Sequence, residues 1–256
     1  MIIDAYTFCW NEEMRLKYYL NLYAPLCRKI TIYDNGSTDS SKEIASKYDN
    51  IIWETETYNQ SEIDDARLTF VKNNCWKQSQ DADWVIVCDV DEILYHTDGL
   101  DNYLSKTLTE TEKRIIQAYG YDMVSSTLPS HEGNFYDDDD FKFGVPNTMY
   151  DKTCIFSPSL VEEINYDPGS HVCDPKPKGP RWRRNKQVMP LHDPNLKLLH
   201  YKYLNKESFV NKQKQFGKKL CEKNIEQKFG IEYLDPQKKM ENQFDEKLKD
   251  RKRVVF

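Results

Sequence analysis

The sequence predicts an α/β fold with a mostly parallel sheet flanked by helices. Strand and helix patterns alternate through the first hundred residues, which is typical of strands joined by right-handed helical crossovers. With 256 residues, of which 39% are hydrophobic and 13% aromatic, the chain can bury one sizeable core. A third observation is a buried-strand pattern at residues 83–92 that ends in three carboxylates within four positions.

Each element of the first half has its own signal. Short apolar and β-branched runs predict strands at residues 2–8, 29–33, 50–53 and 84–88. Helical spacing of apolar residues predicts helices at residues 16–23, 40–48 and 64–78. Ser40 and Glu43 are expected to form a capping box at the start of the second helix. In the third helix, Leu68, Val71 and Cys75 should share one face.

The second half is less regular. One strand is expected within residues 114–126. The acidic run at residues 137–140 is interpreted as a solvated loop in preference to a cation site. Prolines and glycines are frequent in residues 167–195, and from residue 205 the pattern becomes helical and highly charged. We therefore expect one domain over residues 1–204 and a helical C-terminal extension over residues 205–256.

Composition limits the classes of protein that the chain can belong to. No apolar stretch approaches the ~20 residues that span a bilayer, and no signal-peptide pattern begins the chain. Seven cysteines, an odd number without a CxxC pair, argue against a disulfide framework or a structural zinc site and favour a reducing compartment. We expect a cytoplasmic location, with peripheral membrane contact left open.

Charge is distributed unevenly. Residues 202–256 carry a net charge of +6, and the remainder carries −12. This basic segment could contact a membrane surface, a nucleic acid or the acidic body of the protein itself, although a solvated helical face is favoured. No nucleic-acid partner is expected, and a homodimer through the C-terminal helices is left open.

The carboxylates at the end of the fourth strand suggest a cation site. If the chain stays extended there, Asp89 and Asp91 point the same way, because side chains alternate along a strand. Two such charges in contact need a cation or a proton between them. Carboxylate oxygens suit Mg²⁺ or Mn²⁺ bound together with a phosphate. The alternative is a solvated acidic loop after a strand.

Polar clusters follow three of the predicted strands, at residues 7–13, 34–39 and 89–92. The carboxyl ends of parallel strands meet at one edge of the sheet, where open α/β folds bind ligands. We therefore expect the three clusters to converge on one site.

Three motifs together resemble the family 2-like glycosyltransferases of the GT-A fold. They are WNEE at residues 10–13, DNGSTD at 34–39 and VCDVDE, with its DxD pattern, at 87–92. The resemblance covers residues 1–100 well and continues more loosely through 169–171 and 199–201. It implies a nucleotide-diphosphate sugar as donor, with residues 1–100 as the nucleotide-sugar and metal half and residues 101–204 as the acceptor half.

The resemblance also implies roles for individual residues. Asp34 would accept the imide N–H of a base such as uracil, although a simple turn is the alternative reading of its motif. Arg67 could instead pair with Asp64 on its own helix. The expected nucleotide-sugar contacts are Phe8, Asn11, Glu12, Asp34, Asp65, Arg67, Asp89 and Arg181.

The metal implied by the resemblance is Mn²⁺ or Mg²⁺. Asp91 is its main expected ligand, with Asp89 contacting it through water or binding the ribose, and with His200 as a further ligand. Such a metal would act as a Lewis acid that assists departure of the nucleoside diphosphate. Glu92 would lie behind the metal ligands or form an ion pair.

The catalytic base is expected on the acceptor side. His171 is one candidate, with an acceptor contact or metal binding as its alternative roles. Asp174 is the second candidate, and Asp167 and Glu132 compete with it. The basic, proline-rich stretch at residues 173–190, which includes Arg181, could be a lid over the diphosphate or an exposed loop.

The sequence as a whole predicts a metal-dependent glycosyltransferase. It would move a sugar, from a UDP-sugar by preference, to a glycan or other hydroxyl acceptor with inversion. A metal-dependent nucleotidyltransferase or phosphohydrolase is the first alternative. A non-catalytic binding protein on a degenerate transferase fold is the second.

Overall fold

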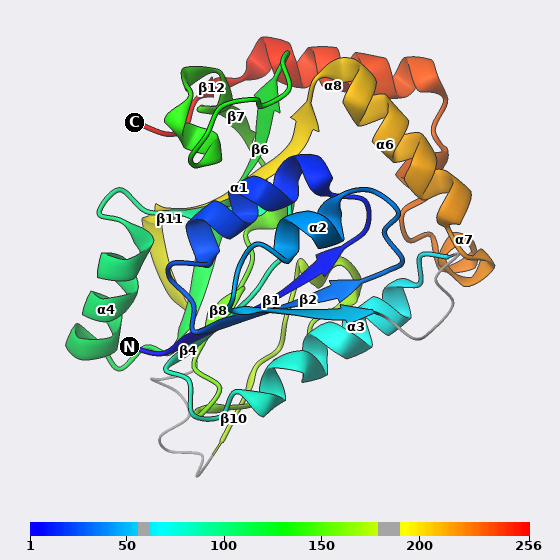
Figure 1. The fold of residues 1–256 in the computed structure, drawn as a ribbon. Coiled ribbons are helices and arrows are strands. Elements are labelled where there is room, and N and C mark those ends of the chain that lie inside the picture. The colour runs from blue at the N-terminus through cyan, green and yellow to red at the C-terminus, as the bar shows by residue number, and fades with distance from the viewer. Residues whose placement is uncertain (56–61, 179–189) are drawn as a thin grey trace.

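The computed structural model describes residues 1–55, 62–178 and 190–256. Its centre is a ten-stranded sheet with helices on both sides (Figure 1). Most strands follow the order β12-β7-β6-β8-β4-β1-β2-β3, and β11 joins β5 to β6 beside this path. The expected α/β fold is therefore confirmed.

The N-terminal half contains the parallel part of the sheet. Strand β1 pairs in parallel with both β2 and β4, and β2 pairs in parallel with β3. The bounds are β1 (Ile3–Cys9), β2 (Lys29–Asp34), β3 (Ile51–Thr55) and β4 (Trp84–Val87). All four strands were predicted to within about two residues at each end. Continuous apolar runs identify β1, β2 and β4, which are buried on both faces, whereas β3 is the half-exposed edge of the sheet.

Helices cover both faces of these parallel strands. Helices α1 (Glu13–Tyr23) and α2 (Ser41–Ala45) lie on one face, and α3 (Asp65–Asn74) with the 3₁₀ turn η1 (Cys75–Gln78) lies on the other (Figure 1). Two separate apolar clusters fill the two layers. The predicted capping box is wrong, since the Ser40 side chain makes no capping hydrogen bond at α2.

The second half extends the sheet mainly with antiparallel strands. Strand β6 runs antiparallel to β7 and β8 and parallel to β11, and β11 runs antiparallel to β5. The elements are β5 (Glu92–Tyr95), α4 (Leu100–Glu110), β6 (Ile115–Ser125), η2 (Phe135–Asp137), η3 (Asp139–Phe141), β7 (Phe143–Pro146), η4 (Thr148–Tyr150), β8 (Ile155–Phe156), β9 (Val161–Glu163), η5 (Pro168–Ser170), β10 (Lys176–Pro177) and β11 (Leu191–Leu204).

The C-terminal segment packs against the sheet. Helix α6 (Lys206–Lys219) is followed by α7 (Glu222–Gln227), η6 (Ile231–Leu234) and α8 (Gln237–Asp250). Phe209 of α6 and Phe244 of α8 share an apolar cluster with Tyr203 of β11. Strand β12 (Lys252–Arg253) then pairs with β7. The segment predicted as an extension is thus joined to the sheet, and the predicted homodimer through these helices remains a prediction.

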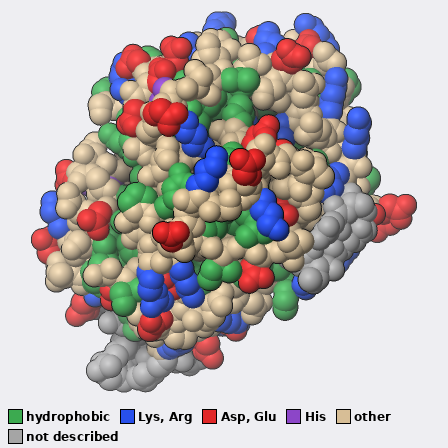
Figure 2. All heavy atoms as spheres, in the orientation of Figure 1, with side chains coloured by type: hydrophobic (Ala, Val, Ile, Leu, Met, Phe, Trp, Pro, Cys, Tyr) green, Lys and Arg blue, Asp and Glu red, His purple; other side chains and the backbone are tan. Residues whose placement is uncertain are grey.

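Charged side chains of both signs are interspersed over the face drawn in Figure 2. Several bases of the C-terminal segment pair with carboxylates of the body, among them Lys212 with Glu12 and Arg253 with Asp139. Contact between the basic segment and the acidic body, one of the options that the charge pattern left open, is therefore confirmed. No helix within the described ranges has the length and apolar character needed to cross a membrane.

Candidate active site

A cavity of about 490 Å³ lies at the carboxyl ends of the parallel strands. Its walls come from the ends of β1, β2 and β4, from α3, from residues 149–152 and 168–171, from β11, and from the C-terminal helices. Seven predicted site residues line it: Phe8, Glu12, Asp65, Asp89, Asp91, His171 and His200. Convergence of the polar strand ends at one edge of the sheet produces this cavity.

The first two strand ends are tied together directly. Asn11 donates its backbone N–H to the Ser37 hydroxyl at 2.9 Å, and its side-chain oxygen accepts the N–H of Thr38 at 2.7 Å. Asp34 accepts the N–H of Ser37 at 2.9 Å, so its carboxylate holds the turn after β2. Neither Asn11 nor Asp34 is among the residues that line the main cavity.

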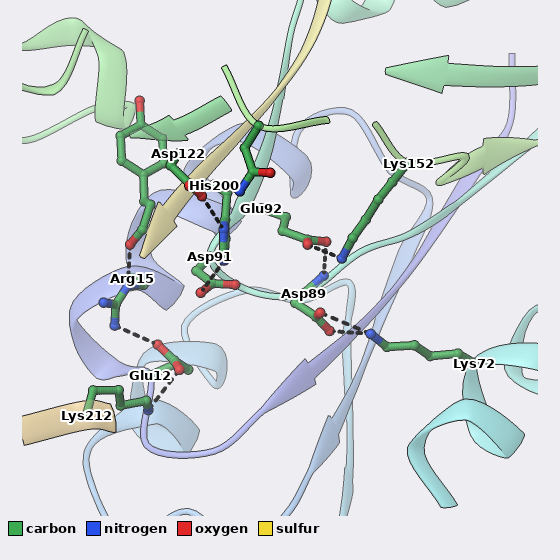
Figure 3. Close-up of polar contacts among 12 residues, drawn as sticks. Glu12, Arg15, Lys72, Asp89, Asp91, Glu92, Asp122, Lys152, His200 and Lys212 are labelled. Atoms are coloured by element: carbon green, nitrogen blue, oxygen red, sulfur yellow. Dashed lines mark hydrogen bonds and ion pairs between the residues drawn. The ribbon is translucent and has the colours of Figure 1, made fainter. Parts of the chain in front are cut away.

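The acidic motif turns where an extended chain was considered. Strand β4 ends at Val87, and the N–H of Glu92 donates to the carbonyl of Asp89 at 3.0 Å. The two aspartates therefore diverge (Figure 3). Asp89 pairs with Lys72 of α3 at 2.8 Å, whereas Asp91 faces His200 of β11 at 3.2 Å. The same-side arrangement expected for an extended chain is not formed.

Glu92 is buried behind this turn. Its carboxylate forms an ion pair with Lys152 and accepts the N–H of Asp89 at 3.1 Å. The two side chains are 2% and 5% exposed. The ion pair that was one of two options for Glu92 is confirmed, and it fixes the backbone from which Asp89 and Asp91 project.

His200 lies between two carboxylates (Figure 3). Its Nε2 is 3.2 Å from Asp91, and its Nδ1 is 3.3 Å from Asp122 of β6, the residue opposite it in the sheet register. Burial acts to lower the pKa of His200, but the two carboxylates outweigh it and raise the pKa to about 9. The Asp122 side chain is 2% exposed. Its carboxylate also accepts hydrogen bonds from the Asn147 amide at 2.9 Å and from the Lys247 ammonium at 2.6 Å.

These residues suit a divalent metal. Metal-binding histidines commonly donate their second ring N–H to a carboxylate, as His200 can to Asp122; Nε2 of the neutral ring and the adjacent Asp91 carboxylate would then be the two groups able to bind a metal. Among the described residues, no group of three His, Cys, Asp or Glu side chains is arranged to hold a metal. A pair of protein ligands matches Mg²⁺ or Mn²⁺ that completes its shell with phosphate oxygens and water.

Aromatic side chains flank the ends of β1 and β2. Phe8 stacks on Tyr33 at 5.4 Å between ring centroids, and Lys72 lies 5.1 Å from the Phe8 ring. Asn35, the first residue after β2, also lines the cavity. Its side-chain oxygen is buried and has no hydrogen-bond partner among the described residues. This corner offers a flat apolar surface beside an unused acceptor.

Glu12 is held by two cations where β1 ends. Arg15 contacts its carboxylate at 3.1 Å and Lys212 of α6 contacts it at 2.8 Å. Lys212 also donates to the carbonyls of Trp10 and Asn11, at 2.7 and 2.8 Å. Helix α6 is thereby fastened to the end of the first strand.

His171 lies on the opposite wall of the cavity. Its Nδ1 donates to the carbonyl of Met149 at 2.6 Å, so Nε2 is left as the basic nitrogen. Burial, aided by the charge of Lys152, lowers the pKa of His171 to about 4 and keeps the ring neutral near pH 7. Gly169 has φ of 80°, and a Cβ there would lie 2.7 Å from the imidazole.

The remaining predicted residues are placed less centrally. Asp65 lines the cavity, and its carboxylate accepts a hydrogen bond from the Asn224 amide at 3.0 Å. Burial raises the pKa of Asp65. Asp174 is exposed and does not line the cavity, and Arg67 also lies outside the lining with its guanidinium 5.6 Å from the Phe70 ring. Arg181 and most of the suggested lid lie outside the described residues.

Comparison with known proteins identifies the family. The model for glycosyltransferase family 92 matches residues 27–239, which is most of the chain. The chain belongs to glycosyltransferase family 92. The match includes the acidic turn, His171, His200 and helix α6, so these site elements fall within the family region. It confirms the predicted glycosyltransferase class and does not favour the nucleotidyltransferase or phosphohydrolase alternative.

Two solved structures illustrate more distant similarity. The first is Staphylococcus aureus TarS (residues 1–349), with 14% identity, coverage of 62% of this chain and 48% of that chain, and a TM-score of 0.37. The second is glucosyl-3-phosphoglycerate synthase from Mycobacterium tuberculosis, solved with Mn²⁺ and UDP, with 16% identity, coverage of 46% and 44%, and a TM-score of 0.32. The family 92 chain thus matches about half the length of each. No curated protein matches it in sequence.

Several residues of this family 92 site were not predicted from the sequence. The most important are Asp122, which orients His200, and Lys152, which neutralises Glu92. Asp122 is the single charged residue in GYDMV, whereas Lys152 follows another charged residue, Asp151, in YDKTC. A charge in an otherwise buried strand needs a partner, and that is the signal that could have identified Asp122. Lys72 and Lys212 carry no comparable signal, because lysines on helices are ordinarily solvated.

Proposed function

We propose that the protein transfers a sugar from a nucleotide-diphosphate sugar to a hydroxyl acceptor with the help of a divalent metal. The observation that carries this proposal is the arrangement of Asp91, His200 and Asp122. A carboxylate and an imidazole face each other at 3.2 Å while a buried second carboxylate orients the imidazole. This arrangement lies at the carboxyl edge of the sheet, inside the cavity.

The donor is assigned to the wall formed by β1, β2 and α3. Phe8 and Tyr33 would provide the apolar surface for the base, and Lys72 lies between this surface and the acidic turn. When bound, the metal would stabilise the negative charge that develops on the leaving diphosphate. Asp91 and His200 would hold it, and Asp89 would contact the ribose or a metal-bound water.

Uracil is the favoured base. Asn35 lines the cavity two residues after Tyr33, its buried side-chain oxygen has no hydrogen-bond partner among the described residues, and an imide N–H is the kind of donor that this oxygen lacks. This assignment moves the role first considered for Asp34 to its neighbour, because the Asp34 carboxylate already accepts the N–H of Ser37.

The acceptor would bind on the side of His171. Its Nε2 is the basic nitrogen, since Nδ1 is held by the Met149 carbonyl. His171 would take the proton of the acceptor hydroxyl as the oxygen bonds to the anomeric carbon and the bond to the diphosphate oxygen breaks. One displacement of this kind inverts the configuration at that carbon. Asp174 is the weaker candidate because it is exposed and outside the lining.

A nucleotide-binding panel tests the proposal. UDP, GDP, CDP and dTDP are each added with and without Mn²⁺, and thermal unfolding is followed. A ligand at ~100 times its dissociation constant stabilises the fold by about 2.7 kcal/mol. We expect a clear rise of the melting temperature with UDP and Mn²⁺ together.

Two variants make the panel specific. Asp91→Asn should abolish the metal-dependent part of the shift. Asp98→Asn is the matched control, because Asp98 is 55% exposed, pairs only with Lys106 among the described residues and lies outside the cavity. If no nucleoside diphosphate shifts the melting temperature in the presence of Mn²⁺, or if both variants behave alike, the proposed function is wrong. Transfer from UDP-sugars to simple glycosides then identifies the sugar and the stereochemistry.

A further inference from the structure

Among the described residues, the ammonium group of Lys202 has no carboxylate partner, whereas the other buried cations of the cavity are paired with carboxylates. Lys202 lies on β11, two residues after His200, and both side chains line the cavity. Among the described residues, no carboxylate lies within 4.0 Å of its nitrogen. In the described part of the chain, its nitrogen lies 5.7 Å from the centroid of the Tyr233 ring, and the carboxylates of Glu232, Asp122 and Asp91 act on it only from beyond ion-pair distance.

The contrast with the neighbouring cations is sharp. Four other cations of the cavity wall are neutralised by carboxylates of the same wall, in the pairs Arg15–Glu12, Lys72–Asp89, Lys152–Glu92 and Lys212–Glu12. Lys228 also lines the cavity, but it is exposed and water can solvate it. Lys202 alone, among the described lining residues, is both partly buried and unpaired.

An unpaired ammonium that is withdrawn from water destabilises the folded protein. An anion that enters the cavity and pairs with such an ammonium offsets this cost, so the pairing contributes strongly to the affinity for the anion. Lys202 adjoins His200 and shares the cavity with Asp91, so the anion would arrive beside the two residues assigned to the metal. Phosphate oxygens that complete a divalent metal's shell would occupy this region.

We propose that Lys202 binds the diphosphate of the donor, at the phosphate that carries the sugar, and stabilises this phosphate as it leaves. The inference rests on the proposed function, because it takes the diphosphate from the donor assigned there. Besides the metal ion, Lys202 would place a second positive charge beside the diphosphate, on the side that faces β11 and η6. An acceptor that carries its own phosphate or carboxylate would offer the same chemistry, and the experiment separates the two sources.

The test compares UDP with UMP in the presence of Mn²⁺, using calorimetric dissociation constants. Lys202→Met removes the charge and keeps the length of the side chain, and Lys202→Arg restores the charge. Lys197→Met is the matched control, since Lys197 lies on the same strand but outside the cavity and donates to the Val254 carbonyl at 2.6 Å.

We expect Lys202→Met to weaken UDP binding by about tenfold to a hundredfold, the usual range for a lost charge-assisted hydrogen bond. UMP binding should change by less than about threefold in the same variant, because UMP lacks the second phosphate. Lys202→Arg should recover most of the UDP affinity. The unliganded Lys202→Met protein should melt at the same temperature as the wild type or higher, because an unpaired charge is removed.

Three results would overturn the inference. Unchanged UDP affinity in Lys202→Met would overturn it, and a raised KM for the acceptor in that variant would then assign the lysine to an acceptor anion. Equal losses for UDP and UMP with a lowered melting temperature would make its role structural. If the wild-type protein binds no nucleoside diphosphate with metal, the proposed function fails and the inference fails with it. In the first two results the wild-type protein still binds UDP with metal, so the proposed function stands and only the inference fails.

Discussion

Substitution of Lys152 by methionine should destabilise the protein far more than loss of a surface lysine. Lys152 and Glu92 are 5% and 2% exposed, and their ion pair lies directly under the acidic turn. Removing the lysine leaves a buried carboxylate with no cation. Breaking a buried pair from one side costs about 3–5 kcal/mol. We therefore expect Lys152→Met to lower the free energy of unfolding by that amount.

Two further variants test whether the unpaired charge is the cause. The double substitution Glu92→Gln with Lys152→Met removes both charges, so most of the lost stability should return. Lys77→Met is the surface control, because the pair between Lys77 and Glu163 is 34% and 38% exposed and should contribute less than about 1 kcal/mol.

Urea denaturation followed by tryptophan fluorescence gives the free energies of unfolding of the wild type and the three variants. The comparison requires that the slope of this free energy against urea concentration is the same in all four proteins. The reasoning is refuted if Lys152→Met loses no more stability than Lys77→Met, or if the double variant is as unstable as the single one. A folded Lys152→Met protein should also bind UDP and Mn²⁺ more weakly, because Glu92 holds the N–H of Asp89 at 3.1 Å.

Three other substitutions give separate expectations. Asp122→Asn should lower the Mn²⁺ affinity of the UDP-bound protein by about 10- to 100-fold, as seen for carboxylates that orient metal ligands, and unchanged affinity in calorimetry would contradict this. His171→Gln should lower kcat by about 10²- to 10⁴-fold with little change in the KM of the donor, and a loss confined to that KM would exclude the base role. Gly120→Ala should cost about 1–3 kcal/mol in thermal unfolding, because the new Cβ would lie 2.4 Å from the carbonyl carbon of Tyr150, and an unchanged melting temperature would show that the loop adjusts freely.

The parallel half of the fold could be predicted because its signals are local. Continuous β-branched runs such as KITIY at residues 29–33 specify buried strands without reference to the rest of the chain. The polar strand ends then had to meet, because parallel strands share one edge. The resemblance to GT-A glycosyltransferases placed Asp91 and His200 at a common site, and the structure places their side chains 3.2 Å apart.

Details of the site depend on contacts between distant segments, and these were not predictable. Asp89 and Asp91 diverge because the backbone turns at Val90, and the partner that fixes this turn is Lys152, sixty residues along from Glu92. Asp122 has no local pattern of its own. Its importance arises from the pairing of β6 with β11, which sets it opposite His200.

The C-terminal segment shows why a charge pattern alone does not reveal which lysines contact the rest of the chain. Its lysines suggest a solvated surface, yet two of them neutralise carboxylates at the site: Lys212 pairs with Glu12 at 2.8 Å, and Lys247 pairs with Asp122 at 2.6 Å. Without this segment, Glu12 would keep only Arg15, and Asp122 would lose a cation while 2% exposed. Because Asp122 in turn contacts His200, α6 and α8 both supply cations to carboxylates of the candidate site, and the family match, which ends at residue 239, includes the first of them, Lys212, but not Lys247.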